Sequence, residues 1–192
     1  FEDLDNLTSG LHGSDFIILA ARPSMGKTAF ALNVVQNVAI RAAKKVGGAP
    51  KTVAFFSLEM SKEQLVTRMI AMDSLVDSQK VQTGQLAEDD WDQVLASAES
   101  IAAAPLYIED SSALTISELR SKCRQLKSKN NLGLIIIDYL QLMSTTGRVE
   151  SRQQFVSDMS RSLKMLAREL DVPIIALSQL NREVDKRPDH KP

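Results

Sequence analysis

Residues 16–30 read FIILAARPSMGKTAF, and this stretch decides the fold. Its first six residues form an apolar run of the length of a buried β-strand, and a helical pattern of apolar residues begins after Gly26. The intervening residues 21–28, ARPSMGKT, match the pattern G-x-x-x-x-G-K-[S/T] except at Ala21, where glycine is usual. A strand, a loop and a helix in this order predict a phosphate-binding loop.

Each residue type in this loop suits the binding of a nucleotide. Backbone N–H groups at a helix start converge on phosphate oxygens, and Gly26 lets the backbone pass close to them. Lys27 can reach the β- and γ-phosphates, and the Thr28 hydroxyl can hold Mg²⁺. The expected loop consists of Arg22, Pro23, Ser24, Met25, Gly26, Lys27 and Thr28. The alternative is an ordinary turn that leaves Lys27 in solvent.

Short apolar runs alternate with helical segments along the rest of the chain, which is typical of a mostly parallel sheet flanked by helices. The expected strands are residues 16–21, 52–58, 106–109, 132–138 and 173–178. The expected helices cover residues 26–45, residues 61–73, a segment around 91–101, a segment opened by Thr115, and a long segment after residue 152. Residues 132–138 are the most hydrophobic strand and are expected at the centre of the sheet. Residues 77–85 are a polar stretch, and the tail 181–192 is expected to be a surface loop.

The apolar spacing also predicts which helix faces lie in the core. The helix around 91–101 is expected to bury Trp91, Val94, Leu95, Ala98 and Ile101. The helix after Thr115 is expected to bury Ile116, Leu119, Cys123 and Leu126, and the last helix to bury Phe155, Met159, Leu163, Leu166 and Leu170. Cys123 is therefore expected to be a small core residue rather than a reactive thiol.

Three further polar residues lie at the end of an expected strand or directly after one. Asp138 ends the most hydrophobic strand, where a carboxylate would orient a water molecule or Thr28 around Mg²⁺, although a lone acid there is commonly a turn residue. Glu59 follows the strand 52–58 and is the candidate base for the attacking water, because Tyr139 rather than Glu follows Asp138. The alternative for Glu59 is an exposed acid before a helix. Gln179 is expected at the same edge, where an amide can sense the γ-phosphate.

Composition limits the class of protein. The 192 residues are 44% apolar and 24% charged with a net charge of -1, which suits one folded domain and excludes a disordered chain. The single cysteine excludes a disulfide scaffold, no apolar run is long enough for a membrane span, and the first residues lack a signal-peptide pattern. Residues 86–110 hold seven acids and no Lys or Arg, whereas residues 144–168 have an excess of basic residues. This asymmetry indicates either an acidic outer face and a basic working face or ordinary solvated helices.

The sequence resembles the C-terminal, RecA-like ATPase domain of bacterial replicative DNA helicases, the DnaB family. The matching segments, in chain order, are FEDLDNLTSGL, ILAARPSMGKTAFALN, FFSLEMSKEQLVTRM, LIIIDYLQLM, SRQQFVSDMSRSLKMLAREL and PIIALSQLNREVDKRP. They cover nearly the whole chain, and ARPSMGKT together with SLEM is specific to this family among phosphate-loop proteins. The alanine at position 21 is usual in the family.

The resemblance implies an α/β, RecA-like P-loop NTPase fold and a homohexamer that uses ATP and Mg²⁺ to move along single-stranded DNA. Carried over by position, Lys27 and Thr28 bind phosphates and Mg²⁺, Glu59 is the catalytic base, Asp138 is the Walker B acid and Gln179 is the sensor. Arg68 matches an arginine that supports the same site. Primase and a helicase loader are implied as partners, and the cytoplasm, with the nucleoid, as the location.

The resemblance also implies that residues 1–192 are an incomplete ATPase domain. An N-terminal collar domain is expected before Phe1, and a DNA-binding loop and final strands with an arginine finger are expected after Pro192. Within the chain, Arg148 and Arg152 are candidates for DNA contacts from their charge and position, and plain loop solubility is the alternative.

Two other classes of protein fit part of the pattern. A different RecA-type ATPase, recombinase-like or clock-type, would share the chemistry, but the ARPSMGKT and SLEM segments weigh against it. A small-molecule kinase or a structural nucleotide-binding module would give no reason for Glu59 and Gln179 to lie at one sheet edge. The helicase motor is therefore the favoured interpretation.

Overall fold

The computed structural model describes residues 2–41, 50–111, 113–138 and 152–180. Its strands are β1 (Phe16–Ala21), β2 (Thr52–Ser57), β3 (Leu106–Glu109), β4 (Leu132–Asp138) and β5 (Ile174–Gln179). They form a sheet in the order β1-β5-β4-β2-β3, and every neighbouring pair is parallel. All five expected strands are confirmed, with β4 at the centre as its composition predicts. The expected burial of residues 16–21 is wrong, because β1 is an edge strand and the Ile18 side chain is 51% exposed.

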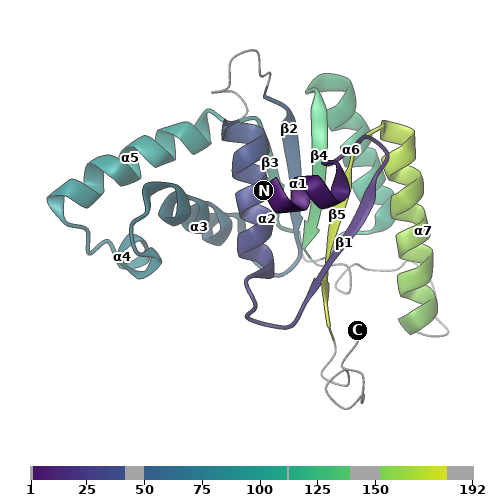
Figure 1. Ribbon diagram of the computed structural model, residues 1–192, viewed down its shortest axis with the longest axis horizontal. Helices are drawn as coiled ribbons and strands as arrows, with labels where there is room; N and C mark the ends of the chain where they lie inside the picture. The colour runs from purple at the N-terminus through teal and green to yellow at the C-terminus, as the bar shows by residue number, and fades with distance from the viewer. Residues whose placement is uncertain (1, 42–49, 112, 139–151, 181–192) are drawn as a thin grey trace.

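Helices cover both faces of this sheet (Figure 1). They are α1 (Glu2–Thr8), α2 (Lys27–Val35), its π-helical continuation η1 (Gln36–Arg41), α3 (Lys62–Ser74), α4 (Ser78–Thr83), α5 (Glu88–Ala102), α6 (Ile116–Lys129) and α7 (Arg152–Leu170). One core cluster joins α2, η1 and α3 to one face, and the other joins α6 and α7 to the opposite face. Cover on both faces explains why the inner strands β2, β4 and β5 are continuous apolar runs.

Two helix starts follow directly from capping sequences. The Ser61 hydroxyl accepts a hydrogen bond from the Gln64 N–H at 3.3 Å, and the Gln64 side chain accepts one from the Ser61 N–H at 3.1 Å. Thr115 and Glu118 form the same reciprocal pair at the start of α6. Both capping boxes are expected from the sequence, because each satisfies backbone N–H groups that have no partner inside the helix.

The interior faces of α6 and α7 are as expected except at the first residue of each expected face, Ile116 and Phe155, which are only partly buried against the core. Leu119, Cys123 and Leu126 are buried on α6, as are Met159, Leu163, Leu166 and Leu170 on α7. Burial raises the pKa of the Cys123 thiol to about 12, so that the thiol is protonated at neutral pH and behaves as a small apolar side chain.

The expectation for α5 is partly wrong. Ile101 is buried, but the side chains of Trp91 and Leu95 are 49% and 54% exposed. The reason is tertiary: α4 and α5 extend away from the sheet beside α3, as Figure 1 shows, so α5 packs mainly against α3, and only Ile101 near its end joins the core cluster of the sheet. An amphipathic pattern identifies an apolar face but not whether the fold provides a surface to bury it.

Three other elements differ from the expectation. The sequence predicts neither α1 nor α4, because both are short and none of their described side chains is buried. The helix expected over residues 26–45 is α-helical only to Val35, after which η1 continues it to Arg41. Residues 42–49 and the tail 181–192, which the sequence predicts as a surface loop, lie outside the described residues.

Replacement of Leu163 tests the packing of α7 on the sheet. Leu163 is fully buried, so Leu163→Ala removes apolar contacts and leaves a cavity, and it is expected to lower the free energy of unfolding by about 2–5 kcal/mol. Met165 lies on the same helix and is 51% exposed, and Met165→Ala is expected to change it by only about 0.5 kcal/mol. Urea unfolding followed by circular dichroism measures both, and equal effects would contradict the packing.

Candidate nucleotide-binding site

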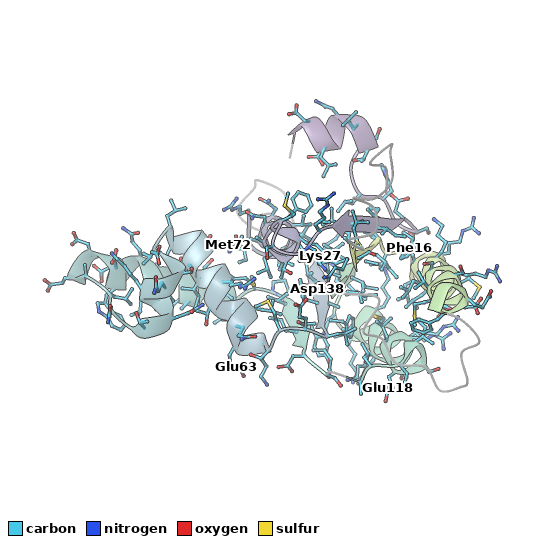
Figure 2. The ribbon with its side chains drawn as sticks, turned by 90° about the horizontal axis from the view of Figure 1, so that it is seen from below. Phe16, Lys27, Glu63, Met72, Glu118 and Asp138 are labelled. Atoms are coloured by element: carbon cyan, nitrogen blue, oxygen red, sulfur yellow. The ribbon has the colours of Figure 1, made fainter. Side chains whose placement is uncertain are left out.

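The parallel register brings the carboxyl ends of the strands to one edge of the sheet. Ala21 of β1 is level with Gln179 of β5, and Ser57 of β2 is level with Asp138 of β4. Figure 2 views the molecule from this edge and shows Lys27 and Asp138 together near its centre. Ligands of open parallel sheets bind outside this edge, where the strand order reverses. Here β5 lies between β1 and β4, so the phosphate loop after β1 and the end of β4 lie on either side of the end of β5.

The backbone of the phosphate loop has the conformation that its sequence predicts. Ser24 and Gly26 have positive φ angles of 63° and 81°, and α2 begins at Lys27 with the Phe30 N–H bonded to the Gly26 carbonyl at 2.9 Å. A Cβ placed on Gly26 would contact no protein atom within 4 Å. Glycine is therefore favoured there by the backbone angle, and the space above it is open to a ligand.

Asp138 is the centre of the polar contacts at this edge. The residue is fully buried, and its Oδ2 accepts a hydrogen bond from the Thr28 hydroxyl at 2.7 Å. The Lys27 Nζ lies 3.4 Å from Oδ1, and the Lys27 side chain is only 11% exposed. The structure thus brings together the three residues from which the sequence analysis builds its phosphate and metal site.

One atom of this group is suited to a metal ion or its water shell. Asp138 Oδ1 is buried and accepts no hydrogen bond, which is costly for a carboxylate oxygen. Within the described residues no group of three or more His, Cys, Asp or Glu side chains is placed to bind a metal. A single carboxylate and a hydroxyl beside a phosphate loop fit Mg²⁺, which is usually held by one or two carboxylates, substrate phosphates and water.

Glu59 reaches the same edge from β2. The Leu58 N–H donates a hydrogen bond to the Asp138 carbonyl at 2.7 Å, which joins the segment that carries Glu59 to the end of β4. The Glu59 side chain is exposed and, within the described part of the chain, forms no hydrogen bond or ion pair. A carboxylate in this position is accessible to a water molecule at the edge, as a general base requires.

The remaining expected residues differ in how closely they approach this group. Gln179 is exposed at the end of β5, beside Ala21, and therefore lies at the expected edge. Arg68 is exposed on α3, and it forms no ion pair with Asp138 or Glu59 in the described structure. Arg148 lies outside the described residues, and the side chain of Arg152 is also outside them. Their proposed roles stay predictions.

Sequence reasoning missed two residues that hold the Glu59 segment. The fully buried Ser57 hydroxyl bonds to the backbone of Met60, and the Asp110 carboxylate accepts a hydrogen bond from the Lys62 N–H at 3.0 Å. The only signal in the sequence is a polar residue at the end of an otherwise apolar strand, which is also common in ordinary turns.

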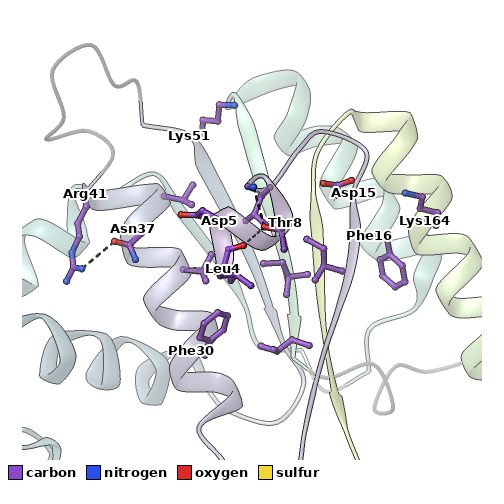
Figure 3. Close-up of a pocket in the computed structure, with 17 residues that line it drawn as sticks. Leu4, Asp5, Thr8, Asp15, Phe16, Phe30, Asn37, Arg41, Lys51 and Lys164 are labelled. Atoms are coloured by element: carbon purple, nitrogen blue, oxygen red, sulfur yellow. Dashed lines mark hydrogen bonds between the residues drawn. The ribbon is translucent and has the colours of Figure 1, made fainter. Parts of the chain in front are cut away.

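A separate apolar cavity of about 750 Å³ lies at the other end of β1 (Figure 3). Leu4 and Thr8 of α1, Phe16 of β1, and Phe30 and Asn37 of the α2–η1 helix line it. Phe16 is the first residue of β1, whereas the phosphate loop follows the last, so this cavity is not the nucleotide site. The volume of this cavity therefore says nothing about nucleotide binding.

The chain also matches proteins of a known family. A family model described as "DnaB-like helicase C terminal domain" matches residues 1–192. The chain belongs to this family. The match to the DnaB-like family covers the whole chain, including the phosphate loop and the strand ends described above.

Individual proteins similar to this chain are replicative DNA helicases. The chain is 51% identical over 193 aligned residues to the replicative DNA helicase DnaB of Geobacillus stearothermophilus, with 100% of the chain and 41% of that relative covered. It is 49% identical to the replicative DNA helicase DnaC of Bacillus subtilis, with the same coverage. The chain therefore spans about two-fifths of the length of these curated relatives.

Solved structures show the same fold. One solved structure, described as an ATPase domain, has a TM-score of 0.89 at 37% identity, and the match covers 100% of this chain and 66% of that one. A DnaB-like replicative helicase studied with primase gives the same TM-score and identity, with 45% of that chain covered. Among the described residues, no helix has the length and apolar character of a membrane span.

Replacement of Thr28 tests the contact between the phosphate loop and β4. Thr28→Val removes the hydroxyl donor to the buried Asp138 carboxylate and is expected to lower the free energy of unfolding by about 1–3 kcal/mol. Thr28→Ser keeps the hydroxyl and is expected to cost about 0.8 kcal/mol or less, for the lost methyl group. Urea unfolding of both variants measures the difference, and equal stabilities would show that the hydrogen bond contributes little.

Proposed function

We propose that this chain is the ATPase motor of a replicative DNA helicase, which couples ATP hydrolysis to movement along single-stranded DNA and to unwinding of the duplex. The observation that carries the proposal is the group formed by Lys27, Thr28 and Asp138 at the carboxyl edge of the sheet. Membership of the DnaB-like family supports the choice of helicase among the ATPases that share this chemistry.

ATP is the proposed substrate, with Mg²⁺ as its counter-ion. The backbone N–H groups from Ser24 to Thr28 would hold the phosphates at the start of α2, where the helix dipole favours negative charge. Lys27 would turn its ammonium group from Asp138 toward the β- and γ-phosphates. Thr28 and Asp138 would hold Mg²⁺, directly or through water, and the ion would neutralise charge on the phosphate oxygens.

Glu59 is the proposed general base. Its exposed carboxylate would orient the attacking water and accept the proton from it. Gln179, at the end of the neighbouring β5, would detect the γ-phosphate and pass its loss to the segment that follows. Arg68 is proposed to support the site from α3, which requires movement of its side chain from the exposed position seen here.

The proposed partners follow from the relatives. Several of them are replicative DNA helicases, and one solved DnaB-like helicase was studied with primase. We therefore propose DNA, in its single-stranded form, and primase as partners of the intact protein. We further propose a helicase loader as a partner and a homohexamer as the assembly, on the basis of the resemblance to the DnaB family alone. The cytoplasm, at the nucleoid, is the proposed location, because the substrate is the chromosome.

DNA-stimulated ATP hydrolysis and unwinding by the full-length protein test this function. We expect single-stranded DNA to stimulate hydrolysis and a forked duplex with a 5′ tail to be separated, and Lys27→Ala to abolish both. Lys62→Ala is the matched control, because Lys62 is exposed on α3. Stimulation by duplex DNA without strand separation would contradict the helicase proposal and favour another RecA-type ATPase.

Replacement of Glu59 tests its role as the base. Glu59→Gln keeps the size of the side chain and removes its basicity, so we expect nucleotide binding to be retained and kcat to fall about 10²-fold or more. Glu63→Gln changes another exposed acid at the start of α3 and is expected to leave kcat unchanged. Nucleotide binding by fluorescence titration and turnover by phosphate release measure the two effects. Wild-type turnover by Glu59→Gln would exclude Glu59 as the base.

A further inference from the structure

We infer that Ser57 is a positioning residue that fixes Glu59 for catalysis, an inference that rests on the proposed ATPase function. Ser57 is the last residue of β2 and is fully buried. Its single hydroxyl donates a hydrogen bond to the Met60 carbonyl at 2.6 Å and accepts one from the Met60 N–H at 3.1 Å. These two hydrogen bonds therefore close residues 57–60 into a hydrogen-bonded ring that includes the backbone of Glu59.

The two ends of this ring are attached to the sheet and to α3. On one side, the Leu58 N–H bonds to the Asp138 carbonyl at 2.7 Å, and the Leu58 side chain is buried in the core. On the other side, Ser61 begins the capping box of α3. Glu59 is thus the one residue from Ser57 to Met60 whose side chain points into solvent.

This arrangement fixes the position of a base whose side chain is exposed. The Glu59 side chain forms no hydrogen bond or ion pair among the described residues, so only its backbone can hold it in place. A displacement of about 1 Å can cost a reaction about 10²-fold in rate, so the position of its Cα atom matters. Ser57 and Asp138 are level in adjacent strands, and the ring therefore holds the base in register with the phosphate and metal site.

The position of Ser57 separates this role from nucleotide binding. None of its hydrogen bonds involves Lys27, Thr28 or the Asp138 carboxylate. Loss of the hydroxyl would loosen the backbone around Glu59 and leave the contacts proposed for the phosphates intact. The predicted signature is therefore a fall in kcat with little change in KM.

The test uses Ser57→Ala in the full-length protein, because alanine fits the buried site and removes both bonds to Met60. We expect kcat for ATP to fall about ten-fold or more and KM to change less than about two-fold. Ser74→Ala is the matched control: Ser74 is buried at the other end of α3, and its hydroxyl also accepts a backbone hydrogen bond, from Val76 at 3.3 Å. This control is expected to keep kcat within about two-fold of wild type while losing a comparable amount of thermal stability.

A double-mutant cycle with Glu59→Gln identifies the residue through which Ser57 acts. If Ser57 acts through Glu59, adding Ser57→Ala to Glu59→Gln should lower the residual rate less than about two-fold. An equal fall in both backgrounds, or an unchanged kcat in Ser57→Ala, would overturn the inference while the proposed function stands. Absence of ATP hydrolysis by the wild-type protein would overturn the proposed function and this inference together.

Discussion

The buried carboxylate of Asp138 is the constraint on which the rest of the site depends. It lies at the end of the central strand, where burial makes an unpaired charge costly. The Thr28 hydroxyl and the Lys27 ammonium compensate that cost, and the backbone carbonyl of the same residue receives the Leu58 N–H. A single residue thus connects the phosphate loop, the central strand and the segment that carries the proposed base.

The parallel sheet makes this connection possible. Because every strand runs in the same direction, the carboxyl ends of β1, β2, β4 and β5 lie at one edge, although these strands are far apart in the sequence. The two core clusters on opposite faces hold the strands in register and supply no residue to the chemistry. The packed core and the proposed site therefore meet at Asp138, which is buried and also contacts the phosphate loop.

The sequence predicts the strands and the phosphate loop well because both depend on local patterns. A short, continuous apolar run is typical of a strand that is covered on both faces of a parallel sheet. The glycine and lysine of the loop have defined physical roles. Helical spacing predicts Trp91 and Leu95 in the core, yet α5 extends beyond the sheet and leaves both exposed. Burial of a helix face depends on which element lies opposite, and spacing along one helix contains no such information. Ser57 and Asp110 escape prediction for a related reason: each is a common turn residue, and only the folded structure shows that they hold the backbone on either side of the Glu59 segment.

The most direct test of this account is a crystal structure of the protein with a non-hydrolysable ATP analogue and Mn²⁺ in place of Mg²⁺. Anomalous scattering locates the ion without assumptions about its ligands. We predict that the phosphates lie on the N–H groups of residues 24–28, that the ion lies beside Thr28 and Asp138, and that the Lys27 ammonium has moved to the phosphates. An ion bound away from Asp138, or a nucleotide bound elsewhere in the molecule, would contradict the account.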